Sequence, residues 1–311
     1  MRMKTIATWF KQLFRARGVQ IISQSPLSLQ YITSYEEYLR HVANMETVYM
    51  QRQAAELQLI PDAATFAVNG SCYVCQQPVD FLVDFQYAYQ TIAEQRIPNW
   101  RERLVCPSCG LNNRLRASIH LFEQECHPTE TDNIYITEQV TPLYQWLRKK
   151  YENTIGSEYI GNAVILGQEN AAGIRNEDMT CLTFPDSAFD HILSFDVFEH
   201  IPAYQKAFQE CFRCLRSRGH LLFSVPFLRN APQTLIRARV LPDGKIEHVL
   251  PAEYHGNPIN EQGSLCFYHF GWDMLDTLRE IGFTDVAALI YWSREFGYLG
   301  GEQIVFLASK A

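Results

Sequence analysis

The fold is decided by residues 176–227, which read NEDMTCLTFPDSAFDHILSFDVFEHIPAYQKAFQECFRCLRSRGHLLFSVPF. A Phe-Pro-Asp turn sequence leads into an apolar run at residues 189–195, which is typical of a strand buried on both faces. Apolar residues at helical spacing follow at 204–216, and a second apolar run follows at 220–225. A strand, a helix and another strand in this order predict one unit of a parallel α/β sheet.

The same alternation extends on both sides of this stretch. Further strands are expected at residues 134–137, 154–159, 286–291 and 303–307. Helices are expected at 142–150 and 272–281, with a hairpin at 234–250. Residues 132–311 are therefore expected to form one α/β domain, with a polar linker before it.

In this register the chain resembles the class I S-adenosylmethionine-dependent methyltransferases, and in particular the type 11 methyltransferases. The resemblance rests on the acidic residue after a strand, the Phe-Pro-Asp turn, the Asp-Val-Phe-Glu-His loop at 196–200 and the strand that ends in Val-Pro. It implies a Rossmann-like class I methyltransferase sheet with an antiparallel last strand. It also implies S-adenosyl-L-methionine as cofactor and methyltransferase activity.

Ligands of such sheets bind across the carboxyl ends of the strands, where the strand order reverses. By the resemblance, Glu158 would hold the cofactor's ribose and Asp178 would bound its adenine. Each carboxylate also has a simpler interpretation, as a surface residue at a strand end or as a turn residue. The full set of cofactor-binding residues that the resemblance implies is Glu138, Glu158, Asp178, Met179, Ser194, Phe195 and Asp196.

Two departures from the family pattern stand out. The loop after the first strand, at residues 136–142, contains none of the glycines that usually allow close approach of a cofactor. Fewer than 20 residues separate Glu158 from Asp178, so the usual intervening helix is expected to be shortened or missing. A catalytically inactive binding protein built on a methyltransferase fold therefore stays open as an alternative.

A hydroxyl acceptor would need a general base, because the methyl donor itself is already activated. The candidates are His200, His255 and His269, although a single histidine is more often structural than catalytic. Glu199 and His200 have a competing interpretation as a helix-entry cap before Pro202.

Two C-x2-C pairs, each in a turn-forming context, precede the α/β region. Two such pairs suit a tetrahedral zinc ion, and four thiolates leave no open position for substrate, so a structural metal is predicted. The 30-residue gap between the pairs is longer than usual, but a redox dithiol would not explain two of them. The predicted zinc ligands are Cys72, Cys75, Cys106 and Cys109.

These patterns divide the chain into an N-terminal helical segment (1–63), a four-cysteine zinc-ribbon-like module (64–126) and the methyltransferase-like domain (132–311). Within the first part, residues 3–16 read as a basic amphipathic helix that would lie on a membrane surface or dock on protein. A capping box of Ser34 and Glu37 starts a second helix at 35–57.

The net charge of −7 opposes binding to a phosphate backbone, so nucleic acid is not the expected partner. A small-molecule or glycan acceptor is expected. The family resemblance implies a role in the synthesis of cell-surface polysaccharides. The alternative is an RNA methyltransferase that would use the arginines near the cysteines, Arg101, Arg103, Arg114 and Arg116. A cytoplasmic location, with possible peripheral membrane contact, is expected because no secretory signal or membrane-spanning run is present.

Overall fold

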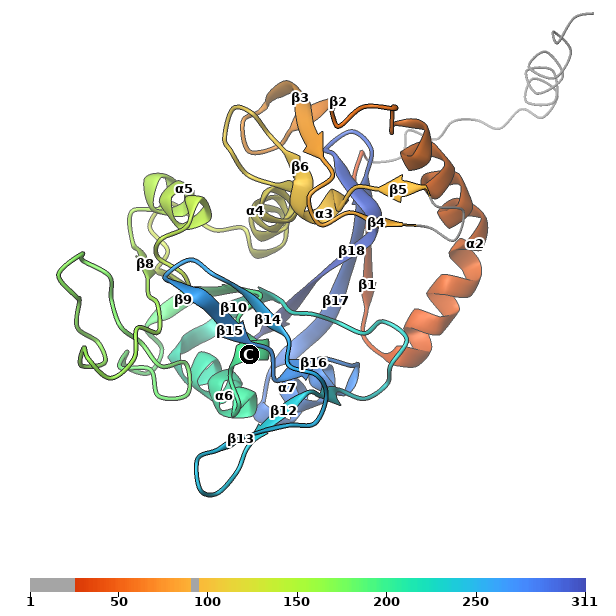
Figure 1. The fold of residues 1–311 in the computed structure, drawn as a ribbon. Coiled ribbons are helices and arrows are strands. Elements are labelled where there is room, and N and C mark those ends of the chain that lie inside the picture. Colours follow the sequence, from red (N-terminus) through yellow and green to blue (C-terminus); the bar gives the residue numbers. More distant parts are fainter. Residues whose placement is uncertain (1–25, 91–94) are drawn as a thin grey trace, which may run out of the picture.

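The computed structural model describes residues 26–90 and 95–311, so the basic helix expected at residues 3–16 lies outside the described part. A seven-stranded mixed sheet forms the centre of the molecule (Figure 1). Its strands, in spatial order, are β1 (Ser28–Ile32), β17 (Thr284–Ser293), β18 (Tyr298–Ser309), β10 (Leu215–Ser224), β9 (Phe189–Phe195), β7 (Ile134–Ile136) and β8 (Thr154–Gly156).

The pairing of these strands confirms the predicted fold class. Strands β8, β7, β9 and β10 pair in parallel, whereas β18 is antiparallel to β10 and β17 is antiparallel to β18. The edge strand β1, antiparallel to β17, was not foreseen from the sequence. Only Ile32 of its five residues is buried, so the strand lacks the apolar pattern that would have predicted it.

Helices cover both faces of the sheet and appear on opposite sides of it in Figure 1. The adjacent residues Ile134 and Tyr135 belong to different buried clusters, as do Ile192 and Leu193. Successive strand side chains point to opposite faces, so both faces of the central strands are buried. One cluster includes helices α4 (Asn113–Cys126) and α5 (Pro142–Lys150), and the other includes α6 (Tyr204–Cys214) and α7 (Asp273–Ile281).

The helix α6 is two residues shorter than predicted, because strand β10 already begins at Leu215. Cys211 and Cys214 are fully buried with Phe208 on the face of α6 that packs into the core. None of the helices in the described residues is long and apolar enough to cross a membrane.

The four-cysteine region forms a small unit against the end of the β17–β18 hairpin (Figure 1). The fully buried Arg116 ties the two together, because its guanidinium lies over the Phe81 ring and donates to the carbonyls of Phe296 and Gly297. The unit consists of β2 (Thr65–Cys72), β3 (Gln77–Asp84), β4 (Tyr89–Gln90), β5 (Arg96–Ile97), α3 (Trp100–Arg103) and β6 (Leu104–Val105).

The long helix α2 (Tyr35–Gln58) runs beside this unit and contacts β18. The hydroxyl of Ser34 caps it by accepting from the amide of Glu37, and the Glu37 carboxylate accepts from the amide of Thr33. The capping box is thus present with its return bond shifted by one residue. Near the helix end, the buried Glu56 carboxylate accepts from the Trp292 indole at 2.8 Å.

Shorter elements lie around the carboxyl ends of the strands. The predicted hairpin is present as β12 (Ala238–Val240) and β13 (Ile246–His248). The other elements are η1 (Phe198–His200), β11 (Leu235–Ile236), β14 (Tyr254–Asn257), β15 (Asn260–Leu265) and β16 (Tyr268–His269).

Candidate active site

The four predicted zinc ligands converge in space. The sulfur of Cys72 lies 3.9 Å from that of Cys109, and the sulfur of Cys75 lies 3.8 Å from that of Cys106. All four sulfurs lie within 4.8 Å of one another. A tetrahedron with zinc–sulfur bonds of about 2.3 Å has sulfur–sulfur edges of about 3.8 Å, so these thiols fit a single zinc ion.

The glycine-free loop after β7 is held by backbone and side-chain hydrogen bonds. Thr141 caps α5 by accepting from the amide of Tyr144, and Pro142 occupies the first turn. Glu138, at the start of the loop, is half-buried, and its Oε1 atom is buried without a hydrogen-bond partner among the described residues. Burial raises the pKa of this carboxyl group to about 7. An unpartnered buried carboxylate oxygen at this point suits a ligand with a hydrogen-bond donor or a positive charge.

Glu158 lies at the end of the β8 segment and reaches back to the same loop. Its Oε1 atom accepts from the amides of Gln139 at 2.8 Å and Val140 at 3.2 Å. Residue 158 also forms an isolated parallel bridge with Asn176. Between these two residues the chain runs in turns without a helix, as the short spacing predicted.

The side chains of Asp178 and Met179 differ in their surroundings. Oδ1 of Asp178 accepts from both the amide and the hydroxyl of Thr180, which is the turn role considered as its alternative. Met179 is buried, and its sulfur lies 3.5 Å from the hydroxyl oxygen of Tyr135.

The carboxyl end of β9 supplies the remaining predicted cofactor-binding residues. Ser194 is fully buried and accepts from the hydroxyl of Thr137, which joins the ends of β9 and β7. Phe195 belongs to the core cluster on the α4–α5 face. Asp196 follows with a φ of +56°, a left-handed conformation that is uncommon outside glycine, and its Oδ1 accepts from Ser224 at 2.7 Å. This strained turn presents its carboxylate at the strand end.

Two arginines of the cysteine-bearing region reach this carboxylate. Nη2 of Arg101 donates to both carboxylate oxygens of Asp196, at 3.0 and 2.9 Å, and Arg114 approaches the same carboxylate to 3.4 Å. Burial opposes ionisation, but the two guanidinium groups hold the pKa of Asp196 well below its ordinary value. From the sequence these arginines were considered only as contacts of an RNA substrate, and neither was paired with Asp196. No local pattern predicts a contact between residues so far apart in the chain.

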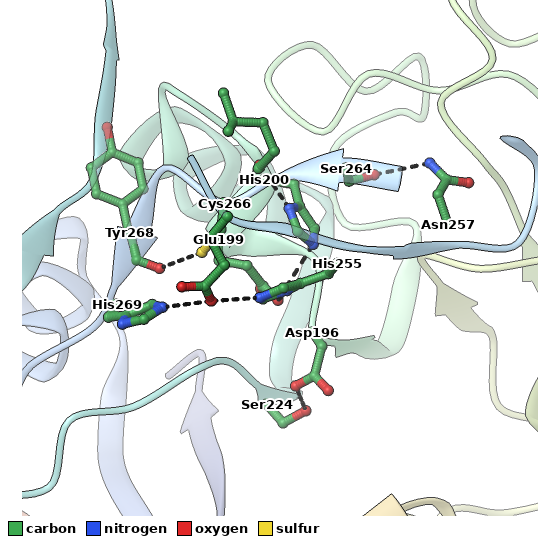
Figure 2. A network of polar contacts seen from close by, with 12 residues as sticks. Asp196, Glu199, His200, Ser224, His255, Asn257, Ser264, Cys266, Tyr268 and His269 are labelled. Atoms are coloured by element: carbon green, nitrogen blue, oxygen red, sulfur yellow. Dashed lines mark hydrogen bonds and ion pairs between the residues drawn. The ribbon is translucent and has the colours of Figure 1, made fainter. Parts of the chain in front are cut away.

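The three candidate histidines gather around the segment that follows Asp196 (Figure 2). Glu199 in η1 is fully buried. Its Oε1 atom lies 3.3 Å from Nδ1 of His255 and 3.5 Å from Nε2 of His200. Its Oε2 atom has no hydrogen-bond partner among the described residues. Glu199, His200 and His255 thus face one another closely enough to share one ligand.

A second carboxylate closes the other side of the cluster. Glu253 Oε1 lies 3.1 Å from Nε2 of His255 and 3.0 Å from Nε2 of His269. The contacts of His255 with Cys266, Glu199 and Glu253 raise its pKa to about 11, so it is protonated at neutral pH. Sequence analysis identified the histidines one by one but missed Glu253, because only the β14–β16 segments bring it to them.

His200 is in the opposite protonation state. Burial lowers its pKa, so the imidazole is neutral at pH 7. Its Nδ1 atom lies 2.8 Å from the carbonyl oxygen of Leu265 and donates to it. The tautomer is therefore fixed, and the Nε2 atom carries a free electron pair that faces Glu199.

The part of the sequence that forms the strands and helices around this site matches a known domain type. Residues 141–223, which include β8, β9, η1, α6 and most of β10, match the family model described as methyltransferase domain. Over these residues the chain is similar to methyltransferase domains.

Solved structures with similar folds have low sequence identity. The YcgJ protein from Bacillus subtilis is 20% identical over 36% of this chain and 51% of its own, with a TM-score of 0.31. This chain therefore spans about half of that protein. A putative S-adenosylmethionine-dependent methyltransferase from Listeria monocytogenes is 11% identical over 64% of this chain and 98% of its own, with a TM-score of 0.39. No curated protein matches the chain.

Proposed function

We propose that the methyltransferase domain transfers a methyl group to a hydroxyl group of a small molecule or glycan, in a pathway such as surface polysaccharide synthesis. The observation that carries the proposal is the histidine–glutamate cluster directly after Asp196, at the carboxyl end of β9. In a sheet of this kind the ligand lies across these strand ends, so the cluster would face the acceptor.

The cofactor would lie over the ends of β7, β8 and β9. Glu158 would accept from the ribose hydroxyls with its Oε2 atom while its Oε1 atom holds the first loop. Glu138 has the orphaned Oε1 atom that a positively charged cofactor group would satisfy. Met179 and Asp178 would contact the adenine, and Ser194, Phe195 and Asp196 would form the floor. When bound, the cofactor supplies a methyl group that is already activated for displacement.

The residues of this chain would then align the acceptor and remove its proton. The acceptor oxygen would form the new bond to the methyl carbon as the bond from that carbon to the sulfonium sulfur breaks and S-adenosylhomocysteine leaves, and the acceptor's proton would pass to Nε2 of His200. His255 is protonated at neutral pH and so would donate a hydrogen bond instead of accepting a proton. His269, paired with Glu253, would orient that carboxylate.

We further propose that the four thiolates hold a structural zinc ion. Such an ion would fix the turn at residues 106–109 and the start of α4. Arg101 and Arg114 on either side of that turn would then hold Asp196 at the strand end. The zinc site would support the active site without taking part in the reaction.

The surroundings of the four arginines favour this acceptor class over RNA. Each is engaged within the protein instead of being free for phosphates. Arg101 and Arg114 contact carboxylates, Arg103 pairs with Asp84, and Arg116 is buried against carbonyl groups. A basic patch for a phosphate backbone needs free cations, which these side chains do not provide.

An acceptor screen tests the proposal. Zinc-loaded full-length protein is incubated with S-adenosylmethionine and either sugars and glycans or RNA, and methylated products are identified by mass spectrometry. We expect a methylated hydroxyl on a sugar or glycan, with turnover reduced about 100-fold in His200→Gln and unchanged in the exposed control His248→Gln. Methylation of RNA alone, or failure of the folded protein to bind S-adenosylhomocysteine, would contradict the proposal.

A further inference from the structure

We propose that Glu199, His200 and His255 bind a divalent transition-metal ion at a site separate from the four cysteines. Their ligand atoms lie within 4.8 Å of one another. The three residues come from η1 and β14, and Figure 2 shows their side chains converging. Two imidazoles and one carboxylate are a common ligand set for such ions.

The two distances from Glu199 inside the cluster are close to those of ligands that share an ion. Glu199 Oε1 lies 3.3 Å from His255 Nδ1 and 3.5 Å from His200 Nε2. Direct charge-assisted hydrogen bonds are shorter, at about 2.7–2.9 Å. Ligands that bind one ion at about 2.1 Å lie about 3.0–3.4 Å apart, depending on the bond angle. A cation between the three groups therefore fits their spacing.

The second oxygen of Glu199 is an independent indication of a missing ligand. The side chain is fully buried, yet Oε2 has no hydrogen-bond partner among the described residues. A buried carboxylate oxygen without a partner is costly, and an ion that the Glu199 carboxylate binds through both of its oxygens would satisfy it. The Glu253 carboxylate on the far side of His255 adds a second negative charge next to the site.

The outer contacts of both histidines are those expected of metal ligands. His200 donates from Nδ1 to the Leu265 carbonyl, which leaves Nε2 for an ion. Nε2 of His255 lies 3.1 Å from Glu253, which leaves Nδ1, the atom facing Glu199. A backbone carbonyl or carboxylate in this outer position fixes the tautomer of a metal-bound histidine.

Three protein ligands would leave coordination positions open for water or for an acceptor oxygen. This part of the inference rests on the proposed function and changes two points of it. With an ion bound, Nε2 of His200 and Nδ1 of His255 both bind the metal, so His200 is not the base and His255 gives up one proton on binding. The acceptor hydroxyl would bind beside them with a lowered pKa. Its proton would then pass to solvent.

Cobalt binding tests the site without any need for activity. Full-length protein whose cysteine site is filled with zinc is dialysed against Co²⁺, and bound cobalt is measured by elemental analysis and visible absorption. We expect one further equivalent of cobalt, without the intense charge-transfer bands that thiolate ligands produce. Glu199→Gln and His200→Gln should each weaken its binding at least about tenfold.

The controls are Glu247→Gln and His248→Gln, which make the same chemical changes on the exposed strand β13. They should leave cobalt binding unchanged, and thermal unfolding checks that every variant is folded. Absence of a further equivalent, or equal affinity in wild type and a folded Glu199→Gln or His200→Gln variant, would overturn the proposal. Calorimetry with S-adenosylhomocysteine on the same samples reports separately on the proposed methyltransferase function.

Discussion

Replacement of Glu158 tests how a loop without glycines holds the cofactor. One carboxylate oxygen accepts from the amides of Gln139 and Val140, and the other would accept from the ribose. Hydrogen bonds to a charged group contribute about 1.5–3 kcal/mol each. Glu158→Ala should therefore weaken binding of S-adenosylhomocysteine about 10- to 100-fold through loss of the ribose contact alone, with a further loss from disorder of the loop.

Glu158→Gln separates the two roles of the side chain. The amide keeps an oxygen for the Gln139 and Val140 amides but lacks the negative charge, so most of the folding stability should remain while affinity still falls about tenfold. Glu158→Ala should lose about 2 kcal/mol of stability, or roughly 4–8 °C in melting temperature. The control is Glu152→Gln, which alters an exposed glutamate in the turn before β8.

Calorimetric titration and thermal unfolding of these variants provide the measurements. If Glu158→Ala bound S-adenosylhomocysteine as tightly as wild type, Glu158 would only stabilise the loop that contains Gln139 and Val140. If Glu158→Ala and Glu158→Gln lost the same stability, the two backbone hydrogen bonds would not be what holds the loop. Either result would refute this account of the site.

Three further predictions concern stability. Burial raises the pKa of Glu138 from 4.5 to about 7, so the stability tied to its neutral form is complete below pH 4.5 and is lost as the pH rises through 7. The free energy of unfolding of Glu138→Gln, measured with urea, should therefore equal that of wild type at pH 4.5. At pH 8 it should be higher than that of wild type by up to about 3 kcal/mol, at about 1.36 kcal/mol per unit of pKa shift. A difference in stability that did not change with pH would contradict this. Cys72→Ser should remove zinc, as measured by native mass spectrometry, and cost several kcal/mol of stability; a variant that lost zinc but kept its stability would show that the metal is not structural. Arg101→Ala should lower the free energy of unfolding by roughly 1–3 kcal/mol, because Asp196 loses one of its partners. The loss should be larger than in Arg103→Ala, which breaks the ion pair with Asp84. Equal losses of stability in the two variants would argue against a special role for Arg101.

Some features could be predicted because their signal lies within a short segment. The strand at 189–195 and the helix at 142–150 appear with the predicted bounds, because periodicity and capping act over a few residues. The two cysteine pairs are likewise local, since each pair lies in one turn. In contrast, β1 depends on its neighbour β17, and its own sequence carries little pattern.

The sequence by itself determined the order of strands and helices, the class of cofactor that the family implies, and the residue types available for chemistry. Only the tertiary structure decided which of these residues meet. Arg101 and Asp196 are 95 positions apart, and Glu199 and His255 are 56 apart, yet each pair lies within contact distance. Such contacts depend on how the cysteine region packs on β18 and how β14 to β16 fold over η1. Packing of this kind is set by the summed burial of many side chains, which no local pattern encodes.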